Sequence, residues 1–419
     1  MSLLKNYHAI IVLHMENIFT ERAHLMCPNM YFGITLIIAA AYDEKRITDS
    51  IKTISEAHSF LNALLGHNEA DNFFYYEITD SSKIELFFKD DFISSIGDEK
   101  LIKEYETITG RDWNLTKEGM LKVAAWKAEE GTAFLLVFHH LLADGRGALG
   151  LAKELADLYV KGMQPELVQE KLIASKDAFP TASKLSFISK YFINKANKLW
   201  EKENHTPLFY KEYHEFAERF IKNDNVRHSL FISDSSKTKQ LLEECTAHSV
   251  TLNDLLMARM YLQDKTDKII IAKDLRDSLG CYRKGALGNY ATAFSVVQKA
   301  KGDDEFSLAA KVHKKVKSIL TRPSDLYLVL QCYASLNPSL LDAAFMASQG
   351  AYKSKAASFI GKMFFSYDVP KGYSITNLGK IEDENINAAY FIPPASPAIR
   401  KTQGVLTVNG QMIICTSER

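Results

Sequence analysis

The 419-residue sequence has no excess of charge of either sign, because its 51 lysine and arginine residues equal its 51 aspartate and glutamate residues. A protein that binds nucleic acid over much of its surface normally carries a large basic excess, since neutralised phosphates supply most of the affinity. Glycine (20 residues) and proline (10 residues) are too scarce for a collagen-like or low-complexity chain. We therefore expect a globular protein that does not bind nucleic acid.

Cysteine and long apolar runs are also scarce. The five cysteines are odd in number, scattered and free of metal-ligand spacing, which is typical of free thiols in a reducing compartment: Cys27, Cys245, Cys281, Cys332 and Cys415. The apolar run at residues 9–13 is too short for a signal peptide, and the longest apolar stretch, residues 34–42, is too short to span a membrane. We expect a cytoplasmic protein with no membrane span.

The first half of the chain predicts a strand, a helix and further strands. Residues 30–41 are apolar and rich in isoleucine, as in a buried strand, and residues 48–65 follow with helical periodicity behind the cap candidates Thr48 and Asp49. Two pairs of strands are expected around turns, and a helix then precedes the expected C-cap Gly162: strands 73–78 and 83–88, strands 120–129 and 132–138, and helix 147–161.

The second half repeats this mixed character. Strands are expected at 225–232, 268–273, 291–298, 388–392 and 404–415, and helices at 235–247, 251–263 and 306–322. Residues 163–210 are more polar and contain three prolines, so we place the boundary there and expect lobes at 1–175 and 176–419. The pattern predicts an α/β (α+β) protein of two lobes, each a mixed β-sheet flanked by helices.

Residues 138–147 carry the clearest chemical signal, because they join a strongly apolar strand to a helix. An imidazole at such a position can remove a proton from a hydroxyl or amine near neutral pH, so a positioned histidine is a candidate general base. Asp144 could fix the loop by pairing with a cation elsewhere, and Gly145 and Gly147 allow close backbone approach.

Other interpretations of the same segment stay open. A histidine pair after a strand is often only polar loop structure. His140 and Asp144 could share a metal ion, although no third ligand lies nearby in the sequence, and we expect no metal. Nucleophilic catalysis by serine or cysteine has no local support, since the chain has no GxSxG motif and no cysteine in a distinctive setting.

The segment His139-His140-Leu141-Leu142-Ala143-Asp144-Gly145 resembles the HHxxxDG signature of the chloramphenicol acetyltransferase-like superfamily. This superfamily includes nonribosomal peptide condensation domains, polyketide-associated acyltransferases and alcohol acetyltransferases. Segments 249–256, 273–276, 287–290 and 374–379 resemble later motifs of its second lobe in the expected order. The resemblance covers nearly the whole chain and implies two chloramphenicol acetyltransferase-like lobes with an active-site tunnel between them.

The resemblance also implies roles for individual residues. His140, the second histidine of the motif, is the expected catalytic base, whereas Asp144 is expected to be structural and paired with Arg276. His139 and Gly145 are expected as structural parts of the site. The second lobe offers three further candidates: Thr376 and Asn377 as donors to a developing oxyanion, and Asn289 as either a turn or a cleft residue.

The implied activity is that of an acyltransferase, without a cofactor. An acyl group would move from a thioester, either acyl-CoA or the phosphopantetheine of an acyl carrier protein, to an alcohol or amine. Two alternatives remain: a stand-alone condensation domain that joins carrier-bound substrates through an amide bond, and a non-catalytic binding member of the same fold. Residues 367–372 match the DFGWG motif of plant members poorly, which favours the bacterial condensation or alcohol acetyltransferase branch. A monomer suffices to form the interlobe site.

A basic helix offers one candidate for the donor's phosphates. Residues 306–322 include Lys311, Lys314, Lys315, Lys317 and Arg322 without a neighbouring acid in that stretch. The helix could meet CoA or an acidic carrier protein. We favour the simpler interpretation of a solvated helix face.

Overall fold

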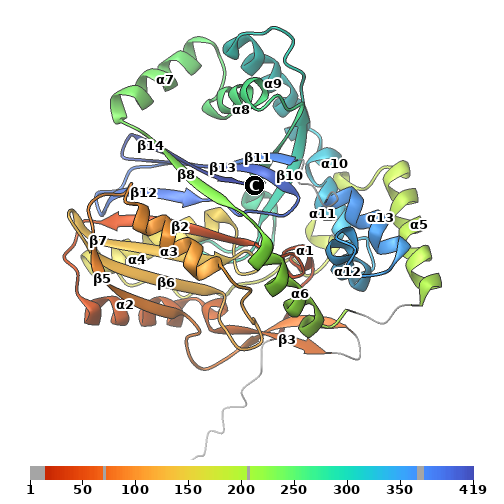
Figure 1. Ribbon diagram of the computed structural model, residues 1–419, viewed down its shortest axis with the longest axis horizontal. Helices are drawn as coiled ribbons and strands as arrows, with labels where there is room; N and C mark the ends of the chain where they lie inside the picture. The colour runs from red at the N-terminus through yellow and green to blue at the C-terminus, as the bar shows by residue number, and fades with distance from the viewer. Residues whose placement is uncertain (1–14, 69–71, 205–207, 366–371) are drawn as a thin grey trace, which may run out of the picture.

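The computed structural model describes residues 15–68, 72–204, 208–365 and 372–419, and these form two lobes that each contain an open β-sheet (Figure 1). The predicted fold class of two mixed, sheet-containing lobes is confirmed. The apolar run at residues 9–13 and the segment 367–371 lie outside the described residues. No helix in the described ranges combines the length and the apolar content that crossing a membrane requires.

The first lobe is built on a five-stranded sheet in the order β12-β2-β7-β6-β5. Its strands are β2 (Tyr31–Ile38), β5 (Glu85–Ile93), β6 (Leu121–Ala128), β7 (Gly131–His139) and β12 (Ile386–Ile392). β6 and β7 form the expected hairpin, and β7 pairs antiparallel with β2, so that His139 lies opposite Tyr31. Every residue of β2 is buried, which explains its unbroken apolar sequence.

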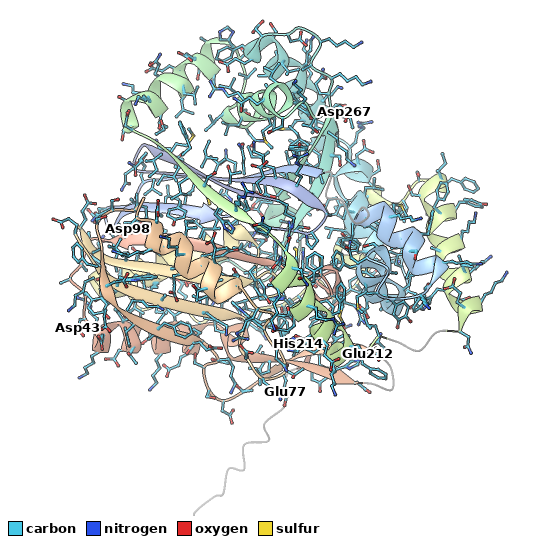
Figure 2. The ribbon with its side chains drawn as sticks, viewed as in Figure 1. Asp43, Glu77, Asp98, Glu212, His214 and Asp267 are labelled. Atoms are coloured by element: carbon cyan, nitrogen blue, oxygen red, sulfur yellow. The ribbon has the colours of Figure 1, made fainter. Side chains whose placement is uncertain are left out.

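Helices α2 (Glu44–Ala57), α3 (Glu99–Thr109) and α4 (Gly145–Lys161) flank this sheet (Figure 1). The helix expected at 48–65 begins earlier, because the Asp43 carboxylate caps α2 by accepting from the Arg46 amide (Figure 2). Thr48 and Asp49 therefore lie inside the helix and do not cap it. The helix also ends earlier, at Ala57, and the chain continues as a short 3-10 turn and then as strand β3 (Ala63–Asn68).

The predicted strand 73–78 is confirmed as β4 (Phe73–Ile78), but its expected pairing with the next strand is wrong. β4 lies between β1 (Met15–Asn17) and β3 in a separate three-stranded sheet, whereas β5 pairs in parallel with β6. The turn at residues 80–82 thus carries the chain from one sheet to another. Local alternation predicts a strand but not its neighbour.

The second lobe has a six-stranded sheet in the order β10-β9-β11-β13-β14-β8. Its strands are β8 (Arg227–Ser233), β9 (Lys268–Asp274), β10 (Ala291–Val297), β11 (Gly372–Ile381), β13 (Ile399–Val408) and β14 (Gln411–Glu418). Three predicted helices lie on its outer side: α7 (Ser235–Ala247), α8 (Leu252–Gln263) and α9 (Glu305–Leu320) (Figure 1).

Within the described ranges, seven further helices were not predicted. They are α1 (Arg22–Leu25), α3, α5 (Phe187–Glu203), α6 (Tyr210–Asn223), α11 (Leu328–Tyr333), α12 (Pro338–Ser348) and α13 (Lys355–Phe364), and the four-residue α10 (Pro323–Leu326) extends α9. Helices α5, α11, α12 and α13 gather at one end of the molecule (Figure 1). The buried side chains of α12 and α13 belong to the same apolar core as the first-lobe sheet.

One strand crosses between the halves of the chain. β12, from the C-terminal half, pairs antiparallel with β2 and so completes the first-lobe sheet. The expectation that 388–392 belongs with the second lobe is therefore wrong, because a strand's own pattern does not state which sheet it joins. The boundary between 1–175 and 176–419 stays a prediction.

Candidate functional site

The signature loop lies between β7, which ends at His139, and α4, which begins at Gly145. Asp144 forms the N-cap of α4, since its Oδ1 atom accepts from the Gly147 amide at 2.9 Å. A Cβ atom on Gly145 would lie 2.8 Å from a methyl group of Leu378, which belongs to β11 of the second lobe. Glycine at 145 thus lets the second lobe approach the start of the helix.

The structure brings Asp144 and Arg276 together across the two lobes. The guanidinium donates from both terminal nitrogens to the carboxylate, at 2.9 and 3.0 Å, and the Tyr290 amide donates to the same carboxylate at 2.9 Å. The side chains of Asp144 and Arg276 are only 7% and 10% exposed. Burial would lower the pKa of Arg276, but Asp144 and then Asp274 raise it, so the guanidinium stays charged. The carboxylate is fully occupied by these structural contacts.

His140 is held by Asn289, from the segment that precedes β10. The Asn289 amide nitrogen donates to the backbone carbonyls of His140 and Leu141, at 2.8 and 3.1 Å. Since only the NH₂ group can donate these bonds, the Asn289 Oδ1 atom is the one that faces His140 Nδ1, at 3.0 Å. Nδ1 must then carry the proton. In the neutral ring this leaves Nε2 with its lone pair.

Two aromatic contacts fix the plane of the half-buried His140 ring. His24 stacks on it, with ring centroids 4.3 Å apart and planes 10° apart, and Phe32 contacts its edge at 5.2 Å. Burial lowers the pKa of His140 below its usual value of 6.5, opposed by its own carbonyl, Asp144 and Asn289. The ring is therefore neutral at pH 7 and ready to accept a proton.

His24 is a site residue that the sequence analysis missed. It lies on the single-turn helix α1, which is anchored when Arg22 donates to both carboxylate oxygens of the fully buried Asp342 on α12. Burial, followed by His140 and His139, lowers the pKa of His24 well below 6.5. No sequence signal could have found this residue, because 114 intervening positions and an unremarkable context separate it from the motif.

His139 is turned away from this arrangement. Its side chain is buried, and its Nδ1 atom accepts from the Leu141 amide at 3.1 Å. Burial, with a smaller effect of His140, lowers the pKa of His139 to about 3. The two adjacent histidines therefore differ in tautomer: His139 has its proton on Nε2, and His140 has it on Nδ1.

An interlobe cavity of 350 Å³ contains the candidate base. Its first-lobe lining includes His140, His24 and Phe32, and its second-lobe lining includes Thr376 and Asn377 of β11. The Asn377 Oδ1 atom accepts from the Gly379 amide at 2.8 Å, so its NH₂ group is the part that can donate to a ligand.

Two cations also line this cavity, Arg146 at the start of α4 and Lys273 near the end of β9. Both are exposed. The basic helix α9 does not line it, and α9 is less isolated from acids than its sequence suggests: Lys311 pairs with Asp303 at 2.6 Å, and Arg322 pairs with Asp325 at 2.8 Å.

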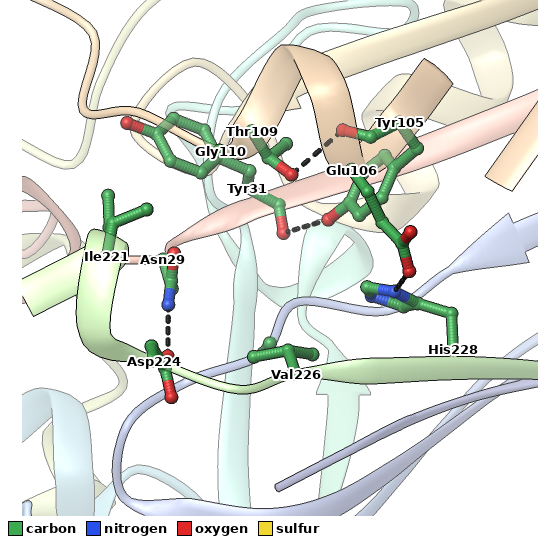
Figure 3. A pocket seen from close by; sticks show the side chains of 11 residues that line it. Asn29, Tyr31, Tyr105, Glu106, Thr109, Gly110, Ile221, Asp224, Val226 and His228 are labelled. Atoms are coloured by element: carbon green, nitrogen blue, oxygen red, sulfur yellow. Dashed lines mark hydrogen bonds and ion pairs between the residues drawn. The ribbon is translucent and has the colours of Figure 1, made fainter. Parts of the chain in front are cut away.

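A second cavity of 210 Å³ lies between α3, the start of β2 and the segment from α6 to β8 (Figure 3). Neighbouring residues separate the two spaces: Phe32 and Pro394 line the interlobe cavity, and Tyr31 and Ala395 line the second. Within it, the His228 Nδ1 atom contacts the Glu106 carboxylate at 2.8 Å (Figure 3).

No group of three or more histidine, cysteine, aspartate or glutamate side chains suited to hold a metal ion occurs among the described residues. His140 and Asp144 are engaged with Asn289 and Arg276, respectively, rather than with each other.

These features define a two-lobed protein with a neutral, oriented histidine in a cavity between the lobes. Residues 29–267, more than half of the chain, match the family model of the condensation domain. The chain therefore belongs to the condensation domain family. Over 230 residues it is 23% identical to bacitracin synthase 2 of Bacillus licheniformis, and this match covers 54% of the chain but only 9% of the synthase.

Solved structures share the fold over almost the whole chain. The first condensation domain of the calcium-dependent antibiotic synthetase, in complex with a substrate analogue, is 8% identical, with a TM-score of 0.62 and coverage of 97% of this chain and 91% of that one. Polyketide synthase associated protein 5 from Mycobacterium tuberculosis is 14% identical, with a TM-score of 0.59 and coverage of 97% and 92%. The epimerization domain from the third module of tyrocidine synthetase B is 15% identical, with a TM-score of 0.56 and coverage of 96% and 92%.

Proposed function

We propose that the protein is an acyltransferase that moves an acyl group from a thioester to an alcohol or amine, with His140 as general base. The observation that carries this proposal is the hydrogen bond from His140 Nδ1 to Asn289, because it leaves the Nε2 lone pair as the proton acceptor. The family supports the same class of chemistry, and its members include condensation domains of peptide synthetases.

In the proposed reaction, Nε2 of His140 accepts the proton of the acceptor's hydroxyl or amine as its oxygen or nitrogen attacks the thioester carbonyl. The C–O or C–N bond forms and the C–S bond breaks, and the imidazolium returns the proton to the departing thiolate. No covalent acyl-enzyme and no cofactor is needed. The stacked His24 ring and the Asn289 amide hold the imidazole in one orientation through both proton transfers.

The second lobe would stabilise the charge that develops on the carbonyl oxygen. The Thr376 hydroxyl and the Asn377 NH₂ group are the candidate donors, since both residues line the cavity. Asp144, in this proposal, does not touch substrate. It holds the loop in place through Arg276, Gly147 and Tyr290.

The donor and acceptor would enter from opposite sides. The phosphates of a CoA or carrier-protein phosphopantetheine donor need cations, and Arg146 and Lys273 at the interlobe cavity meet this need better than helix α9. The second cavity is the candidate for the opposite entrance. Both cavities form within one chain, so we also propose that a monomer is sufficient for activity.

A second candidate function is amide-bond formation between two carrier-bound substrates, favoured by the match to a peptide synthetase. A third is binding without turnover. Purified protein should be tested for free thiol release with acyl-CoAs of increasing chain length and with acylated carrier protein, each against a panel of alcohols, amines and carrier-bound amines. Turnover with an alcohol or a free amine supports the first function, and turnover only with carrier-bound amines supports the second. Binding of a donor without thiol release supports the third.

The test of mechanism is His140→Ala, with the exposed His248→Ala as a matched control. We expect the first variant to fold normally and to lose roughly 10²- to 10⁴-fold in rate, the usual contribution of a general base. The control should keep the wild-type rate. Because the pKa of His140 is lowered, wild-type kcat/KM should stay constant below pH 6.5 before it falls at more acidic pH. An unchanged rate in the His140 variant would exclude this residue as the base.

A further inference from the structure

Helix α5 carries apolar side chains on the face that points away from the protein. Its inner face is buried through Ile193, Ala196 and Trp200. On its first two turns, by contrast, four large side chains are exposed to solvent. Their exposed fractions are 85% for Phe187, 67% for Ile188, 56% for Tyr191 and 41% for Phe192. Four large apolar side chains within six residues are thus left in solvent.

Helix α13 extends this apolar surface. It packs beside α5 at the edge of the molecule (Figure 1) and exposes Phe359 at 38% and Met363 at 47%. The Phe192 and Phe359 rings lie 6.3 Å apart, so the apolar side chains of the two helices adjoin. A soluble monomer rarely exposes a contiguous apolar patch of this kind unless the patch binds something.

Lysines surround the same surface. Residues 184–203 and 353–364 contain eight lysines and only two glutamates, in a chain whose total charge is zero. Lys195, Lys198 and Lys202 are exposed and follow the apolar turns of α5 at helical spacing. One of the two glutamates, Glu203, is already engaged, because it accepts from the Ser354 hydroxyl at 2.6 Å and from the Lys355 amide at 2.9 Å.

A groove of 900 Å³ runs between the two helices. Its lining includes four lysines, one glutamate and two apolar side chains: Lys202, Lys353, Lys355, Lys362, Glu203, Leu199 and Phe359. The lysines of this lining match the charged headgroup of an anionic lipid, and Leu199 and Phe359 match its first acyl carbons.

We propose that this surface, which we call the α5–α13 face, docks onto the surface of an anionic phospholipid bilayer. Exposed aromatic and aliphatic side chains next to lysines form the pattern of a protein segment that lies in the membrane interface. An acidic carrier protein would use the lysines but would leave the apolar turn at 187–192 without a role. A second copy of the chain would bring eight more lysines against the first eight, which repel.

Helix α5 contacts the segment that follows α11, a helix that lines the interlobe cavity. Asn197 of α5 donates to the Ser335 carbonyl at 2.9 Å and accepts from the Asn337 amide at 2.9 Å. The residues just before this contact belong to α11, whose Leu330 and Tyr333 line the cavity. In a docked protein, α11 would thus connect the membrane-bound helix α5 with the interlobe cavity.

The test is co-sedimentation of the full chain with vesicles, which needs no turnover and is therefore independent of the proposed function. Vesicles of phosphatidylcholine with about 30% phosphatidylserine are compared with vesicles of pure phosphatidylcholine over a range of salt concentrations. We expect binding to the anionic vesicles that weakens as salt screens the lysines. Phe187→Ser with Ile188→Ser, and separately Lys195→Glu with Lys198→Glu, should each weaken binding by at least about tenfold.

The matched control is Lys314→Glu with Lys317→Glu, which makes the same charge change on exposed positions of α9. This variant should bind vesicles as the wild type does. Circular dichroism verifies that all variants fold. The proposal is overturned if the wild type does not bind anionic vesicles, or if both α5 variants bind them as tightly as the wild type. It is also overturned if light scattering shows a dimer that the α5 variants convert to monomers.

Discussion

The hydrogen bond between Asn289 and His140 gives the sharpest prediction about the candidate base. Replacing Asn289 with alanine removes the acceptor for His140 Nδ1–H and the donor that holds the carbonyls of His140 and Leu141. Asn289 is 7% exposed, so water only partly replaces these three bonds. At about 1 kcal/mol each, their loss should lower the free energy of unfolding by about 2–3 kcal/mol.

The effect on activity follows from the same numbers. Loss of about 1 kcal/mol of preference for the Nδ1–H tautomer changes the tautomer ratio by about fivefold, and a less restrained ring loses further rate. The loss of rate cannot exceed the full contribution of the general base, which is roughly 10²- to 10⁴-fold. We therefore expect kcat/KM of Asn289→Ala to fall by between about fivefold and a hundredfold, less than that of His140→Ala.

The assay has two parts. Initial rates of thiol release give kcat/KM, and ¹⁵N NMR of histidine-labelled protein reports which ring nitrogen of His140 carries the proton. Asn289→Asp is the discriminating variant, because a carboxylate keeps the acceptor and should raise the pKa of His140, which moves the acidic limb of the pH profile upward. The reasoning would be refuted if the neutral His140 ring of the wild type carries its proton on Nε2, or if Asn289→Ala keeps the wild-type kcat/KM.

Three further predictions concern the Asp144–Arg276 pair, the buried His58 and the donor site. Asp144→Asn should lower the free energy of unfolding in urea by about 3 kcal/mol, because the buried Arg276 guanidinium loses its main anion; a loss under about 0.5 kcal/mol would contradict this. Burial would lower the pKa of His58, but hydrogen bonds to two glutamates raise it to about 9. The charged His58 should thus add about 3 kcal/mol to the free energy of unfolding below pH 6.5, and this contribution should disappear as pH rises through 9. The measurement is the difference in free energy of unfolding between the wild type and His58→Gln at each pH. A difference that does not vary with pH would refute this prediction. Lys273→Glu should raise the KM for acyl-CoA by about three- to tenfold, whereas Lys314→Glu on α9 should leave it unchanged, and equal effects would remove Lys273 from the donor site.

The pieces that the sequence predicted well depend on local interactions. The apolar run of β7, the helical periodicity of α4, and Gly162 at its end with φ of +70° are each recognisable within a few residues. The family motif likewise occupies seven consecutive positions. The site loop, its candidate base and the two-lobed fold class could therefore be derived before any contact was known.

The partners of the site were decided by tertiary structure. Asn289 and His24 reach His140 from 149 and 116 positions away. The family resemblance offered Asn289 only as a turn or cleft residue, and His24 lies in no recognised motif. Arg276 was proposed only from the family resemblance, whereas its two bonds to Asp144 follow from the approach of the lobes.

The same limit applies to the sheets. The sequence by itself determined where strands such as β4, β5 and β12 occur, because alternation and apolar content are properties of a short segment. The pairing of the strands was decided only by the tertiary structure, since it depends on hydrogen bonds and packing between distant segments. β4 pairs with β1 and β3 rather than with β5, and β12 pairs with β2 of the first lobe. Zero net charge was likewise visible in the sequence, but the lysines and aromatics of the α5–α13 face meet only because α13 packs beside α5.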